Sequence, residues 1–362
     1  MRNLLASRLA DRYELVHFET GSRGAESPAK DEALLRKVVR IVRSPFALAW
    51  AIVHTRARVV HINSVLDHKG FWRDIVYVLV SRSFGCRVLL QMHGGALADL
   101  CRYRALRPLV RWAMALPQAV VLLATQEIRD FAAEGITEHL HVIPNGIDVS
   151  AYQRAGVREH SGTVRRLVYM GRLVQTKGIF EAVEAMKILR ADPRFRDIEL
   201  HIAGSGPDET QLRRLIQERG LSDCIVLVGP VYGAGKIDFL RKADIFLFPT
   251  YHREGLPYCV LESLAAGTPL ITTRVAGIPD AVIDGVHGRL IESRDPMQIA
   301  VAVRSLSALG AGLRQMSRDC AARAAEVYSL ERLALRFGEM YEQAGVSGGR
   351  RREKLDVQGN GS

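Results

Sequence analysis

The sequence predicts an α/β protein of two Rossmann-like doubly wound domains that face a central cleft. Short apolar runs rich in β-branched residues alternate with helical segments along most of the chain. The alternation restarts after residues 149–163, which are polar and aperiodic and which we interpret as a linker. The chain has 362 residues, more than one core usually holds, so two domains are the default.

The elements follow from these runs in order. In the first domain we expect strands at 56–64, 86–95, 118–125 and 139–148, and helices at 71–85 and 126–135. In the second we expect strands at 165–173, 224–231, 243–250 and 269–273, a helix at 179–191, and a strand, glycine turn and helix within 198–220. The sequence pattern at 316–343 predicts one long helix or a helix pair.

These elements place the domain boundaries. We expect a first domain at 1–155, a second at 160–325, and a C-terminal helix at 326–346 that packs back towards the first domain. The polar, basic tail at 347–362 is typical of disorder. The beginning predicts a helix with Leu4, Leu5, Leu9 and Ala10 on one stripe, followed by a strand at Tyr13–Phe18.

Composition excludes several classes of protein. The net charge of +11 and the pI near 9.7 indicate an anionic partner such as a phosphorylated ligand or an anionic membrane surface. Five scattered cysteines without a CxxC pair argue against a disulfide framework and a zinc site, and favour a reducing cytoplasm. No apolar run reaches about 18 residues, and no signal peptide is recognised. Nothing resembles a nucleic-acid-binding module.

Residues 254–273, EGLPYCVLESLAAGTPLITT, carry two glutamates in an otherwise apolar or small stretch. We expect a helix over 256–266 with Pro257 as its first residue, so that the amides of Gly255, Leu256 and Tyr258 form an anion site at its positive end. Glu262, inside this helix, could accept hydrogen bonds from the vicinal hydroxyls of a ribose. The alternative is a solvated Glu254 and a salt-bridged Glu262.

Loops at other strand ends add candidates. Arg172 and Lys177 offer two cations for a diphosphate, against the alternative of solvated loop residues. Gly204 and Gly206 form a glycine turn that is weak as a dinucleotide fingerprint, so a structural role is the favoured interpretation. His93, before two glycines, could bond a sugar hydroxyl or be a structural histidine.

Two basic segments of the first domain could rest on an anionic membrane. They are residues 36–52 and residues 101–117, the second with Arg104, Arg107 and Arg111 near one helical face. The commoner alternative is that both are solvated faces.

The sequence resembles the retaining glycosyltransferases of family four (group one), which have the GT-B fold. The resemblance covers nearly the whole chain and is densest at 165–291. It rests on VYMGRLVQTKG, HIAGSGPDE, the Glu254–Glu262 spacing after a strand, and AGIPDAVIDGVHGRLI, with HGG at 93–95 and NGID at 145–148 in the first domain.

The resemblance implies roles for these residues. Arg172 and Lys177 would hold the donor diphosphate, and Glu254 would orient the transferred sugar. Glu262 would bind the ribose, the backbone of 255–257 would cradle sugar and phosphate, and His93 would reach the donor sugar. The implied reaction is metal-independent, needs no cofactor beyond the nucleotide-diphosphate sugar as co-substrate, and retains configuration as the leaving phosphate takes the acceptor proton.

The implied protein is a cytoplasmic enzyme, in peripheral contact with the inner face of the membrane, that builds envelope polysaccharide or lipid-linked glycans. Two features depart from the family: the first strand and its Gly-rich loop are missing, for which we favour a start upstream of Met1, and Asp280 stands where the family often has Glu. The alternatives are an N-terminally truncated, non-catalytic sugar-nucleotide-binding protein and a nucleotide-sugar epimerase of similar fold. An epimerase would convert free sugar nucleotide without an acceptor.

Overall fold

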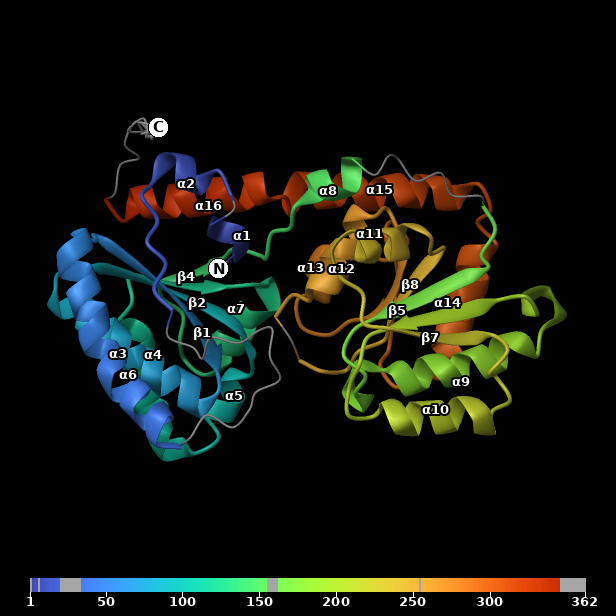
Figure 1. The fold of residues 1–362 in the computed structure, drawn as a ribbon, viewed down its shortest axis with the longest axis horizontal. Helices are drawn as coiled ribbons and strands as arrows, with labels where there is room; N and C mark the ends of the chain where they lie inside the picture. Colours follow the sequence, from blue (N-terminus) through green and yellow to red (C-terminus); the bar gives the residue numbers. More distant parts are fainter. Residues whose placement is uncertain (1, 6, 20–33, 155–161, 254, 346–362) are drawn as a thin grey trace, which may run out of the picture.

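A computed structural model describes residues 2–5, 7–19, 34–154, 162–253 and 255–345 (Figure 1). Three sequence predictions therefore lie wholly or partly outside the described residues: the role of Glu254, the end of the linker at 155–161, and the tail at 347–362. None of the described helices combines the length and the hydropathy needed to cross a bilayer.

The first lobe is built on a four-stranded parallel sheet in the order β1-β2-β3-β4. Its strands are β1 (Val59–Leu66), β2 (Arg87–Gly95), β3 (Ala119–Leu122) and β4 (Leu140–Val142). Its helices are α3 (Leu34–Thr55), α4 (His68–Ser83), α5 (Leu97–Leu100), α6 (Arg107–Ala115) and α7 (Thr125–Ala133), with a 3-10 turn η1 (Arg104–Leu106). β3 is wholly buried, as expected for an inner strand of a covered parallel sheet.

The second lobe is built on a six-stranded parallel sheet in the order β10-β9-β8-β5-β6-β7. Its strands are β5 (Arg166–Met170), β6 (Glu199–Ala203), β7 (Ile225–Gly229), β8 (Ile245–Phe248), β9 (Leu270–Thr273) and β10 (Gly288–Ile291). Its helices are α9 (Ile179–Arg190), α10 (Glu209–Glu218), α11 (Gly233–Arg241), α12 (Tyr258–Ala265), α13 (Ile278–Ala281), α14 (Pro296–Ser307) and α15 (Gly312–Val327), with 3-10 turns η2 (Gln175–Lys177) and η3 (Pro193–Phe195). The doubly wound α/β architecture predicted from the sequence is confirmed.

Two predictions about connecting segments are wrong. No strand forms at Tyr13–Phe18, because this segment, after α1 (Arg2–Leu5) and α2 (Leu9–Arg12), packs on α16 (Leu330–Gln343) instead. The Tyr13 hydroxyl donates to Gly338 O at 3.2 Å, and the ring meets Tyr341 edge-on at 5.5 Å. Residues 149–154 of the expected linker form a helix, α8 (Val149–Arg154), which buries Tyr152. β10 was not predicted.

The chain passes between the lobes twice, and the two passages are hydrogen-bonded to each other. The amide of Ile147 donates to Tyr328 O at 2.8 Å, and the amide of Leu330 donates to Ile147 O at 3.1 Å. In Figure 1 this crossing lies between α15 and α16, which continue one another along the same side of both lobes. The predicted helix at 316–343 is therefore a pair.

Helix α16 returns to the first lobe and covers one face of its sheet. Phe337 and Met340 pack with Leu89 of β2 and Val121 of β3 in one apolar cluster. The Tyr341 hydroxyl lies 2.8 Å from Nδ1 of His61, whose Nε2 lies 3.1 Å from Oε1 of Gln91. Burial lowers the pKa of His61 to about 4, so the ring is neutral at pH 7.

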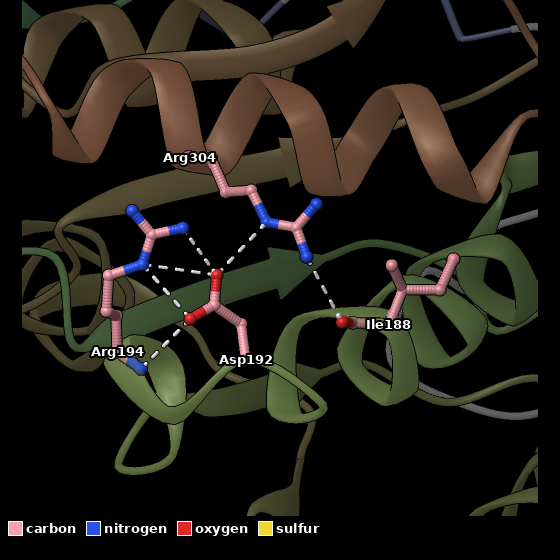
Figure 2. A network of polar contacts seen from close by, with 4 residues as sticks. All are labelled: Ile188, Asp192, Arg194 and Arg304. Atoms are coloured by element: carbon pink, nitrogen blue, oxygen red, sulfur yellow. Dashed lines mark hydrogen bonds and ion pairs between the residues drawn. The ribbon is translucent and has the colours of Figure 1, made fainter.

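In the second lobe, a polar network joins α9 to α14 (Figure 2). The Asp192 carboxylate caps η3 by accepting from the Arg194 amide at 3.1 Å and also pairs with the Arg194 guanidinium at 2.6 Å. Arg304 reaches across from α14, with Nε 3.8 Å from Asp192 Oδ2 and a terminal nitrogen donating to Ile188 O at 3.4 Å. The guanidinium hydrogen bonds hold the pKa of Asp192 at about 2.

We expect acid to destabilise the protein through His61. Its pKa is about 4 in the fold and about 6.5 when unfolded, so unfolding takes up a proton between these values. The contribution of neutral His61 is complete above about pH 6.5 and declines as pH falls towards 4, by up to about 1.4 kcal/mol per pH unit. Urea unfolding across this range should therefore be less pH-dependent in His61→Gln than in the exposed-site control His141→Gln. Equal slopes for the two variants would contradict the prediction.

Candidate functional site

The predicted site residues lie at the carboxyl ends of strands from both sheets. Arg172 follows β5, the Gly204 turn follows β6, and the loop before α12 follows β8. His93 lies near the end of β2 in the other lobe. In doubly wound sheets these ends form the ligand-binding edge, so the fold aims both sets of loops at the space between the lobes.

The backbone of Gly255 in the second lobe lies close to the first lobe. A Cβ placed on Gly255 would lie 2.7 Å from Leu123 Cδ1, and one placed on Gly94 would lie 3.8 Å from the Gly255 nitrogen. A side chain at 255 would first meet the side chain of Leu123, so glycine keeps this approach close. The His93–Gly95 end of β2 and the loop before α12, far apart in the sequence, therefore adjoin.

Asn145 and Asp280 fasten the same junction. The Asn145 amide group donates to Leu256 O at 2.9 Å, and its Oδ1 accepts from the Tyr258 hydroxyl at 3.3 Å. The Asp280 carboxylate accepts from the amide of Thr125 at 2.5 Å. Sequence reasoning did not assign either residue a role in joining the lobes, although both stand in quoted motifs, because only the assembled lobes reveal their partners.

The helix after Gly255 starts one residue later than predicted. Pro257 has φ −65° and ψ 130°, so it is the N-cap of α12, and Tyr258 is its first helical residue. An extended residue at this position is the usual geometry of an N-cap, and Pro257 itself has no N–H to orient. The amides of the first turn still point out of the helix end, beside the contact with the other lobe, and can bind an anion.

Glu262 is largely buried and paired with a lysine that sequence reasoning missed. Its side chain is 14% exposed, and Oε1 lies 2.5 Å from Nζ of Lys236 on α11. Burial raises the pKa of Glu262, and the hydrogen bond and charge of Lys236 oppose that shift. No spacing rule connects α11 to α12, so the sequence holds no signal for this pair. The carboxylate thus has one oxygen on Lys236 and a second that could accept ligand hydroxyls.

The two predicted cations lie on one connection after β5, in which Lys177 is the last residue of η2. Burial lowers the pKa of Lys177, the charge of Arg172 lowers it further, and the nearby Cys259 opposes this. The loop is tied to the residues after β8, because the amides of Tyr251 and His252 both donate to Thr176 O, at 3.0 and 3.1 Å. Burial and the charge of Lys177 lower the pKa of His252, a neighbour that sequence reasoning missed.

Gly204 and Gly206 support the Arg172 loop. A Cβ on Gly204 would lie 1.9 Å from Gly171 O, and one on Gly206 would lie 2.1 Å from Leu173 O. Asp208 is the N-cap residue of α10 and accepts from the Gln175 amide at 2.7 Å. The glycine turn therefore sets the position of the loop that carries both cations, which agrees with the structural interpretation of its sequence.

His93 is held by Asn63 of the neighbouring strand β1. Nε2 of His93 lies 2.6 Å from Asn63 Oδ1, an acceptor, so Nε2 carries the proton and Nδ1 is left as an acceptor. Burial lowers the pKa of His93 to about 4, which keeps the ring neutral at pH 7. Within the described part of the chain, no three His, Cys, Asp or Glu side chains are grouped as a metal ion would require.

Residues 156–326 match the profile of the family described as Glycosyl transferases group 1. D-inositol 3-phosphate glycosyltransferase of Geodermatophilus obscurus is 32% identical in an alignment 192 residues long that covers 48% of this chain and 42% of that protein. The amylovoran biosynthesis glycosyltransferase AmsK of Erwinia amylovora is 27% identical over 298 residues, 81% of this chain and 69% of that protein. The chain spans about half the length of the first relatives it matches.

Solved structures share the fold at low sequence identity. A glycosyltransferase from Rickettsia africae ESF-5 superposes with a TM-score of 0.73 and 16% identity, over 91% of this chain and 85% of that one. Alr3699/HepE of Anabaena, crystallised with UDP, superposes with a TM-score of 0.68 and 15% identity, over 83% and 84%. These similarities extend over both lobes.

Substituting Gly204 should destabilise the protein by dislodging the Arg172 loop. We compare Gly204→Ala with Gly220→Ala, because both glycines have positive φ, at +141° and +68°, but nothing lies within 4 Å of a Cβ on Gly220. The control should cost about 1 kcal/mol from its left-handed backbone. Gly204→Ala should cost at least about 2 kcal/mol more in urea unfolding, because the clash is with backbone. Equal losses would show that the contact with Gly171 O is not rigid.

Proposed function

We propose that this chain, whose residues 156–326 are a glycosyl transferases group 1 domain within a GT-B fold, moves a sugar from a nucleoside diphosphate sugar to an acceptor hydroxyl. The observation that carries the proposal is the junction at Gly255. There the start of α12, which could bind phosphate, lies near the His93–Gly95 end of β2 in the other lobe, and the Arg172–Lys177 loop is hydrogen-bonded to Tyr251 and His252 just before it.

The donor would lie along the second lobe. Arg172, Lys177 and the first amides of α12 would take the diphosphate, since guanidinium, ammonium and helix-end N–H groups all favour it. Glu262 would accept the ribose hydroxyls with the carboxylate oxygen that does not face Lys236. Gly255 and Leu256 would present backbone to the sugar, with Glu254 as the orienting carboxylate.

The reaction would proceed with retention and without a metal ion. The cations and the helix start would stabilise charge on the departing diphosphate, the task that a metal ion performs elsewhere. The leaving phosphate would take the proton of the attacking hydroxyl, so no glutamate need form a covalent bond to the sugar. His93, neutral and with Nδ1 as an acceptor, would bond a donor-sugar hydroxyl across the cleft.

For the acceptor, we propose only its chemical class. The chain is similar to proteins of amylovoran and, by name, putative colanic acid biosynthesis, both concerned with bacterial polysaccharides. We therefore propose a cytoplasmic enzyme that extends a polysaccharide or lipid-linked precursor at the membrane surface. The test is a screen of UDP, GDP and ADP sugars with and without lipid-linked acceptors. Turnover that needs no acceptor, or none with any donor, would overturn the proposal.

Removing either glutamate should cripple transfer while the fold survives. Glu254→Ala should lower kcat by about a hundredfold, the usual loss for a group that acts on the reacting sugar. Glu262→Gln should mainly raise the KM for the donor, by about tenfold, through loss of charge-assisted bonds to the ribose. Glu218→Ala, which removes an exposed partner of Arg214, is the control and should match wild type. Wild-type kinetics in both site variants would refute the assignment.

Asn63 should act by holding His93 neutral and oriented. In Asn63→Asp a carboxylate faces the imidazole and raises its pKa, so His93 becomes charged at higher pH. The acid limb of the kcat/KM profile should then move from near 4 towards neutral pH. A simple packing defect would lower the rate at every pH without moving this limb, and that result would contradict the prediction.

A further inference from the structure

Helix α3 of the first lobe carries a second apolar face that points to solvent. Figure 1 shows α3 on the outer side of the first lobe, away from the second lobe. Large side chains recur at spacings of three and four residues on this face: Val42 58% exposed, Phe46 73%, Trp50 64% and Val53 55%. With Val39, which is also exposed, the stripe runs from Val39 to Val53, about 21 Å of helix.

The opposite face of α3 is anchored, so the stripe cannot turn inward. Pro45 lies inside the helix and removes the N–H that would bond Ile41 O, and the Ser44 hydroxyl donates to that oxygen at 3.0 Å instead. The buried Ser44 hydroxyl then accepts from the Tyr77 hydroxyl of α4 at 2.7 Å. Leu48, one turn on from Ser44, is buried against the lobe. These contacts determine which side of α3 faces out.

The charge of this segment has one sign. Residues 34–66 contain six Lys or Arg residues and no Asp or Glu. Arg43 is exposed beside the stripe, and Arg56 and Arg58 are exposed just beyond the helix end. His54 stacks on the Trp50 ring at 3.8 Å. By contrast, Arg107 of the second basic segment pairs with the Glu134 carboxylate at 3.4 Å, and Arg111 donates to the Glu134 backbone carbonyl at 2.6 Å.

We propose that α3 is a membrane-docking helix that lies in the headgroup region of an anionic bilayer, with Phe46 and Trp50 inserted. A helix with an apolar stripe, an interfacial tryptophan and cations without carboxylates has the chemistry of such a surface. A second copy of this chain fits less well, because it would bring two acid-free basic segments together. Docking through α3 would hold the enzyme at the surface that presents the acceptor. This role of the docking helix rests on the proposed function, whereas membrane binding itself does not.

Vesicle co-sedimentation of the full chain tests the proposal without any nucleotide sugar. Binding is compared between phosphatidylcholine vesicles with and without phosphatidylglycerol, at low and high salt. The test variant is Phe46→Ser/Trp50→Ser. Its matched control is Met297→Ser/Val301→Ser, which removes two similarly exposed apolar side chains, 52% and 53%, from one face of α14. Circular dichroism checks that both variants fold, and Arg43→Glu gives a charge-only variant.

Wild type and the control should bind vesicles that contain phosphatidylglycerol, and salt should weaken binding. Phe46→Ser/Trp50→Ser should lower the partition coefficient at least about tenfold, and Arg43→Glu should lower it less. No binding by wild type, unchanged binding by the test variant, or a wild-type dimer that the test variant dissociates would overturn the proposal. The test variant should still transfer sugar to a water-soluble acceptor. If wild type itself shows no transfer, that result would count against the proposed function and not against membrane docking.

Discussion

The structure depends on how closely two parallel sheets can bring their carboxyl ends together. Each sheet alone presents half of a site, and neither half can enclose a ligand. One close approach is at Gly255, whose missing side chain leaves room for the Leu123 side chain of the other lobe. Asn145 and Asp280 fasten the same junction with hydrogen bonds, two of them to backbone groups of the opposite lobe. The site is thus a product of the contact between the lobes.

Charge within the cleft is arranged around this contact. Lys177 is partly desolvated, and its lowered pKa shows that burial and Arg172 both disfavour its charge. An anionic ligand would relieve this cost, because it would bring opposite charge next to two cations in a partly dry site. Glu262 shows the reverse situation, since Lys236 already compensates its burial. The cleft therefore carries two cations on the Arg172 loop and an acid–lysine pair at α12.

The two connections between the lobes explain why the junction is stable. They run side by side at Ile147 and Tyr328, so the relative position of the lobes is held by backbone hydrogen bonds as well as by side chains. Helix α16 then buries Phe337 and Tyr341 against the first sheet. The segment at 13–18 packs on this helix through Tyr13. The predicted strand does not form at 13–18, because tertiary packing outweighs local β-propensity.

Local sequence patterns predict the two-sheet architecture, most strands and helices, the strand ends near Arg172 and His93, and the helix that carries Glu262. These follow from local rules: apolar periodicity, glycine turns and helix signals act within a few residues. Folding is needed to show that Lys236 pairs with Glu262 and that Asn63 orients His93, because each pair joins two elements that no sequence spacing relates. Packing also decides that α12 begins after Pro257 and that the apolar stripe of α3 stays exposed, because a helical period does not say which face is buried.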